Sequence, residues 1–186
     1  MNKLPFRKIA PVRTYTGREL PDYSGYKDFL ENDYNERCGY TDCHQFWFGG
    51  KRTFQIDHFK PKIKFPELLN KYSNLVYSCS YVNRAKSEDL NEYLDPCDCD
   101  YNENFYRDEV GHIYPEDNSP IARYMYKALK LYLKRYSIIW ILESLEEKME
   151  VLREIVEKTG DDEAKELFFS ITTKYMDYKK YLRAVQ

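Results

Sequence analysis

Two adjacent ionisable residues and two later asparagines carry the chemistry that this sequence offers. Asp57 and His58 end the alternating stretch of residues 52–58, and Asn74 and Asn83 follow it. Carboxylate and amide oxygens suit a hard divalent cation such as Mg²⁺ or Mn²⁺, and a neutral imidazole accepts a proton near pH 7. A metal ion beside a general base can hydrolyse a phosphodiester. We therefore expect His58 to activate water, and Asp57 and Asn83 to bind the cation.

The elements that must position these residues are predicted as strand, loop, strand and helix. Residues 52–58 alternate like a strand, the prolines of 59–74 favour a loop, 75–79 is a short apolar strand, and 83–92 can form a helix. Neighbouring strand residues point to opposite faces, so the strand must twist or end at Asp57 and His58 for both to reach one phosphate. Asn74 precedes the second strand, where its amide can tie the loop to the backbone near His58.

Basic residues flank both segments and are candidates for contact with nucleic-acid phosphates: Lys60, Lys62, Arg84 and Lys86. The formal net charge of −2 does not by itself separate such a surface from an ordinary solvated one. Residues 87–118 are rich in acids, with Arg107 as their one Lys or Arg. We expect this acidic stretch to point away from a bound polyanion.

The flanking regions predict further parts of an α+β protein. Residues 1–23 read as an extended basic arm that packs loosely or grips a partner, and a short helix is expected over 25–35 within a domain of residues 24–118. In the region 119–186, one long helix is expected from Ser119 to Lys158. Gly160 would end it, and a second amphipathic helix from Asp161 or Asp162 would complete an antiparallel helical hairpin.

The order Asp57-His58, Asn74-Leu75 and Asn83-Arg84-Ala85-Lys86 resembles the HNH endonuclease family in its H-N-N variant. The resemblance covers roughly residues 38–92 and implies a ββα-metal core that cleaves DNA. It also implies that His58 is the general base, that Asp57 and Asn83 are ligands of Mg²⁺ or Mn²⁺, and that Asn74 braces the loop.

A weaker resemblance extends over 93–113 and the helix that follows. It is to the small nuclease partners of ATPases in Septu-type phage defence, and it implies an ATPase partner protein. Cutting both strands with one site per chain would call for a homodimer. The alternative is a non-catalytic nucleic-acid-binding or ATPase-partner subunit that retains the fold.

The cysteines depart from the family pattern. Many members hold a structural zinc with two Cys-x-x-Cys pairs, but here Thr41 follows Cys38 and Val82 follows Cys79 at the second position of each pair. Cys38, Cys43 and Cys79 are the candidate zinc ligands, and buried free thiols are the alternative. Five cysteines, with no apolar leader or bilayer-length apolar run, favour a cytoplasmic protein with reduced thiols and no membrane partner.

Overall fold

A computed structural model describes residues 2–185 as a mixed α+β protein, which confirms the predicted class. The chain divides into two compact units. The first holds the residues through Asp108 together with Ile113–Tyr132, and the second holds Glu109–His112 and the residues from Leu133 onward.

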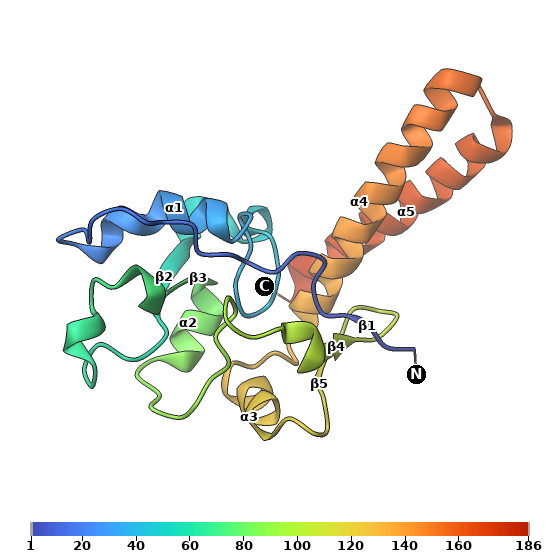
Figure 1. Cartoon of the computed structure of the whole chain (residues 1–186). Helices are drawn as coiled ribbons and strands as arrows, with labels where there is room; N and C mark the ends of the chain where they lie inside the picture. The colour runs from blue at the N-terminus through green and yellow to red at the C-terminus, as the bar shows by residue number, and fades with distance from the viewer. Residues whose placement is uncertain (1, 186) are drawn as a thin grey trace. The chain divides into compact units, whose positions relative to one another are not determined.

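A two-stranded antiparallel sheet followed at once by a helix lies in the first unit (Figure 1). Strand β2 (Phe54–His58) pairs with β3 (Leu75–Cys79), and α2 (Ser80–Lys86) continues directly from β3. All five residues of β3 are buried, which suits a mostly apolar strand that includes Val76 and Tyr77. The predicted order of strand, loop, strand and helix is therefore confirmed, although the helix begins and ends earlier than expected.

The loop between these strands is organised by two short 3₁₀ turns, η4 (Pro66–Leu68) and η5 (Tyr72–Asn74). The short helix expected over 25–35 is present as a 3₁₀ turn, η1 (Tyr23–Tyr26), that leads into α1 (Lys27–Asp33). Further 3₁₀ turns cover Gln45–Phe48 (η2), Lys51–Thr53 (η3) and Tyr101–Glu103 (η6).

A second sheet, which the sequence did not indicate, incorporates the amino-terminal arm. Its order is β1 (Leu4–Pro5), β4 (Phe105–Arg107) and β5 (Ile113–Pro115), all antiparallel. Phe6 and Arg7 are buried, and Arg7 donates to the carbonyl of Gly39 at 2.6 Å. The expectation of a loosely packed arm is therefore wrong for this segment.

The single helix expected from Ser119 to Lys158 is two helices, α3 (Pro120–Ala128) and α4 (Lys134–Thr159). Ser119 caps α3, since its hydroxyl accepts from the amide of Ala122. The break follows because Lys130 has a φ of 54°, a left-handed conformation that ends a helix. The single-helix prediction is wrong because no glycine or proline marks this break.

In the second unit, α4 and α5 (Asp162–Ala184) pack together as the predicted helical hairpin. Gly160, with a φ of 67°, ends α4, and the Asp161 carboxylate accepts from the Ala164 amide at 2.7 Å to start α5. Across the hairpin, the Tyr175 hydroxyl donates to Glu146 at 2.7 Å. Over residues 2–185, no helix is long and apolar enough to cross a bilayer.

Candidate active site

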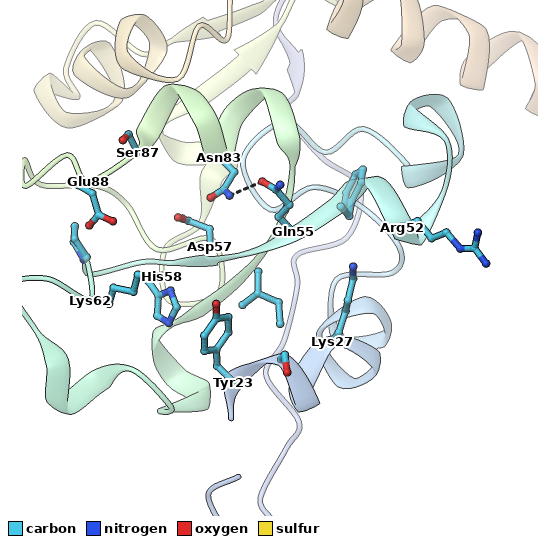
Figure 2. A pocket seen from close by; sticks show the side chains of 14 residues that line it. Tyr23, Lys27, Arg52, Gln55, Asp57, His58, Lys62, Asn83, Ser87 and Glu88 are labelled. Atoms are coloured by element: carbon cyan, nitrogen blue, oxygen red, sulfur yellow. Dashed lines mark hydrogen bonds between the residues drawn. The ribbon is translucent and has the colours of Figure 1, made fainter. Parts of the chain in front are cut away.

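A pocket of about 520 Å³ lies in the first unit, along β2 and beside α2 (Figure 2). Asp57, His58 and Asn83 all line it, so three of the four predicted site residues meet at one cavity. Asp57 and His58 are neighbours in β2 and still share the pocket, because the strand ends at His58. Asn74 is not among the lining residues.

The imidazole of His58 is half-buried and held in one tautomer. Its Nε2 lies 3.0 Å from the carbonyl oxygen of Leu69. A carbonyl only accepts, so Nε2 carries the proton and the Nδ1 lone pair is left as a base. The Tyr23 ring packs edge-on against the imidazole, with centroids 4.7 Å apart.

Electrostatics keep this ring neutral. Burial lowers the pKa of His58 below its ordinary 6.5, and the charges of Lys62 and Lys86 act in the same direction. The Leu69 carbonyl and the Asp57 carboxylate oppose that shift in part. A neutral imidazole is the form that can take a proton from water near pH 7.

Asn74 ties the loop after β2 together. Its Nδ2 donates to the carbonyls of Lys60 at 3.0 Å and Leu68 at 3.3 Å, while its Oδ1 accepts from the Lys60 amide at 2.8 Å. Its backbone carbonyl also accepts from the Phe59 amide at 2.8 Å. The side chain is buried and engaged on both its nitrogen and its oxygen, so its position suits bracing rather than contact with substrate.

The Asp57 carboxylate is bound by two buried residues that do not line the pocket. The Tyr40 hydroxyl donates to Oδ2 at 2.6 Å, and the Lys86 ammonium lies 3.0 Å from the same oxygen. Lys86 also donates to the backbone carbonyl of His58 at 2.8 Å. Burial raises the pKa of Asp57, and the Lys86 charge and the Tyr40 hydrogen bond oppose that rise.

The expectation that Lys86 contacts nucleic acid is wrong for this structure. Its side chain has no exposed surface, and its ammonium is committed to Asp57 and the carbonyl of His58. Sequence position alone did not separate it from Arg84, which is exposed on the same helix. The difference arises because residues three apart share one helix face, so Lys86 turns toward β2 together with Asn83.

Asn83 and Asp57 both line the pocket and carry side-chain oxygens that could bind a cation. The Nδ2 of Asn83 donates to Oε1 of Gln55 at 2.6 Å, which leaves its Oδ1 as a further acceptor (Figure 2). Two protein oxygens, one from a carboxylate, fit the usual Mg²⁺ site, whose shell is completed by water and substrate phosphate. The ion pair with Lys86 reduces the negative charge with which Asp57 would attract a cation. No group of three or more His, Cys, Asp or Glu that could hold a metal ion occurs among residues 2–185.

The basic residues divide by place. Lys62 lines the pocket, whereas Lys60 and Arg84 are exposed outside its lining, and contact of these three residues with nucleic acid stays a prediction. Arg84 donates to the Ser80 carbonyl at 3.2 Å. The pocket also includes residues that the sequence reading missed: Tyr23, Lys27, Gln55 and Glu88. Of these, only Gln55 had a usable signal, because it is two residues before Asp57 on a strand and so shares its face.

Three cysteines proposed as zinc ligands, Cys38, Cys43 and Cys79, are all buried free thiols. Burial raises the pKa of the Cys79 thiol, and the neighbouring Cys38 adds to that rise. Thr41 and Val82 are fully buried at the positions where a Cys-x-x-Cys pair would place its second thiol. The buried-thiol alternative accounts for these contacts, and zinc binding stays an untested prediction.

Comparison of this chain with protein-family models, with curated proteins and with solved structures finds no match.

Proposed function

We propose that this protein is a metal-dependent endonuclease of the HNH type that hydrolyses phosphodiester bonds in DNA. The observation that carries the proposal is the pocket shared by Asp57, His58 and Asn83 at the end of an antiparallel strand pair. It joins an oxygen donor pair to a neutral imidazole whose tautomer is set by Leu69. The choice of DNA rests on the sequence resemblance.

In this proposal His58 removes the proton from the attacking water. The Nδ1 atom accepts it, while Nε2 keeps its own proton and donates it in the hydrogen bond to the Leu69 carbonyl, which holds the ring in place during transfer. A Mg²⁺ or Mn²⁺ ion held by Asp57 and Asn83 would stabilise charge on the phosphate and on the departing 3′ oxygen. The product would carry a 5′ phosphate.

Two buried residues position this machinery. Asn74 fixes the loop that carries Leu69, the hydrogen-bond partner of His58. Lys86 fixes Asp57 through its carboxylate and His58 through its backbone carbonyl. Both act through other residues, since neither lines the pocket.

One observation favours the second candidate, a nucleic-acid-binding or ATPase-partner subunit without turnover. The Asp57 carboxylate is already neutralised by Lys86, which weakens its attraction for a divalent cation. Plasmid nicking separates the two candidates. The nuclease proposal expects nicking with Mg²⁺ or Mn²⁺, loss of nicking with a chelator, and loss in Asp57→Asn. DNA binding without nicking across several divalent ions would favour the second candidate.

The biological setting is a further part of the proposal. A role in bacterial phage defence with an ATPase partner, and a homodimer that cuts both strands, rest on the sequence resemblance and on one candidate site per chain. Size-exclusion chromatography of the isolated protein, with and without DNA, shows directly whether it forms the homodimer.

A further inference from the structure

The pocket continues beyond the proposed reaction centre toward two basic side chains. Lys27 begins α1 and Arg52 lies in η3, and both line the cavity together with Gln55 (Figure 2). Lys62 lines the same cavity from the loop after β2. Figure 2 shows Arg52 and Lys27 on one side of the Asp57–Asn83 pair and Lys62 on the other.

The two basic groups have no neutralising partner in residues 2–185. Neither Lys27 nor Arg52 forms an ion pair or a side-chain hydrogen bond there. The adjacent Lys51 behaves differently, because its ammonium pairs with Asp28 at 2.6 Å and also with Glu31. The turn η3 therefore carries Lys51, which is neutralised by carboxylates, next to Arg52, whose guanidinium is available to a ligand in the pocket.

The charge balance along the lining is positive. Its carboxylates are Asp57 and Glu88, and Asp57 is neutralised from beneath by buried Lys86. The cationic groups Lys27, Arg52 and Lys62 remain. Phosphate is the group that an unpaired guanidinium and ammonium recognise best, because guanidinium donors match two phosphate oxygens at once.

We propose that Lys27 and Arg52 form a second phosphate subsite, which binds a non-scissile phosphate of an extended polynucleotide strand. This inference rests on the proposed function, since the strand would pass from the subsite across His58 to Lys62. Because Lys27 and Arg52 lie on the opposite side of the Asp57–Asn83 pair from Lys62, a ligand that contacts both groups must extend across that pair. The chemical class that fits is therefore an oligonucleotide with phosphates at regular intervals, rather than a small phosphodiester.

Fluorescence anisotropy with a short labelled single-stranded oligonucleotide tests the subsite without requiring turnover. We expect the Lys27→Ala/Arg52→Ala protein to bind about tenfold more weakly or worse, because two charged contacts are lost. The slope of log affinity against log salt should become shallower by roughly 0.7, the amount for one neutralised phosphate of a single strand. Lys27→Arg/Arg52→Lys should retain most of the affinity.

Two controls make the result specific. Lys148→Ala/Arg153→Ala removes the same charge from exposed positions of α4 and should leave affinity unchanged. An oligomer with an uncharged methylphosphonate backbone should bind wild type and the Lys27/Arg52 variant equally weakly. Unchanged affinity and salt slope in Lys27→Ala/Arg52→Ala would overturn the subsite, as would an equal loss in the α4 control. Absence of nicking with intact binding would instead overturn the nuclease proposal alone.

Discussion

The ammonium of Lys86 lies 3.0 Å from Oδ2 of Asp57, and the lysine side chain is entirely enclosed. This contact joins the end of α2 to the end of β2. Asn83 lies one helical turn before Lys86, so the same contact sets the face of α2 that Asn83 presents to the pocket. The buried pair therefore positions the cation donors that the proposed reaction needs.

Removing one partner of this pair should be costly. We expect Lys86→Met to lower the free energy of unfolding by about 3–5 kcal/mol, because it leaves the buried Asp57 carboxylate without its counter-charge. Asp57→Asn/Lys86→Met should recover part of that loss, since neither charge then remains. Urea unfolding of the single and double variants measures both values.

The matched control for this prediction is Arg84→Met, which changes an exposed base on the same helix. It should shift the free energy of unfolding by about 0.5 kcal/mol or less. A Lys86→Met protein as stable as Arg84→Met would show that the buried contact contributes nothing to the fold.

The pH dependence of cleavage should report His58. Only the neutral ring accepts a proton, so activity is full above the pKa of His58 and falls as pH drops through it. Because burial and nearby lysines lower that pKa, the acid limb of kcat/KM should have its midpoint below pH 6.5. Initial nicking rates at a fixed Mg²⁺ concentration give the profile.

Lys62 provides a signed test of that assignment. Its charge lowers the pKa of His58, so Lys62→Gln should move the acid midpoint upward. Lys64→Gln removes the same charge from a nearby exposed position and should move the midpoint less than Lys62→Gln does. If the acid midpoint of Lys62→Gln equals that of wild type, the acid limb belongs to a group other than His58.

The buried cysteines allow a gain-of-site experiment. Thr41→Cys/Val82→Cys would complete two Cys-x-x-Cys pairs at fully buried positions. We expect the purified double variant to hold about one zinc per chain, because four thiolates satisfy its tetrahedral preference. Wild type should hold far less by elemental analysis. A full equivalent of zinc in wild type would contradict the buried-thiol interpretation of Cys38 and Cys79.

Sequence reasoning picked out three residues that line one pocket, Asp57, His58 and Asn83, because the signals of the elements that carry them are local. The strand β3 is a compact, mostly apolar run, and Asp57 and His58 end the strand that pairs with it. The hairpin of α4 and α5 was likewise visible in apolar spacing and in Gly160. Each of these features depends mainly on residues that are close together in the sequence.

Features that depend on distant packing were not visible. Lys86 and Arg84 are both basic residues of one short segment, so the sequence does not distinguish them. Lys86 is buried because it lies on the face of α2 that packs against β2, whereas Arg84 lies on the exposed face. Tyr40 donates to Asp57, which is seventeen positions later in the sequence. Strand β1 pairs with β4 although about a hundred residues separate them. The helix break at Lys130 has no local marker, because a lysine rarely adopts a left-handed conformation.

The most direct measurement is nicking of supercoiled plasmid by His58→Ala beside wild type, under single-turnover conditions with saturating Mg²⁺. His112→Ala, which alters a histidine of the second unit, is the matched control. We predict a loss on the order of 10²–10⁴-fold for His58→Ala, partial recovery of His58→Gly by added imidazole, and a near wild-type rate for His112→Ala. A His58→Ala protein that nicks as fast as wild type would contradict the assignment of His58 as the general base.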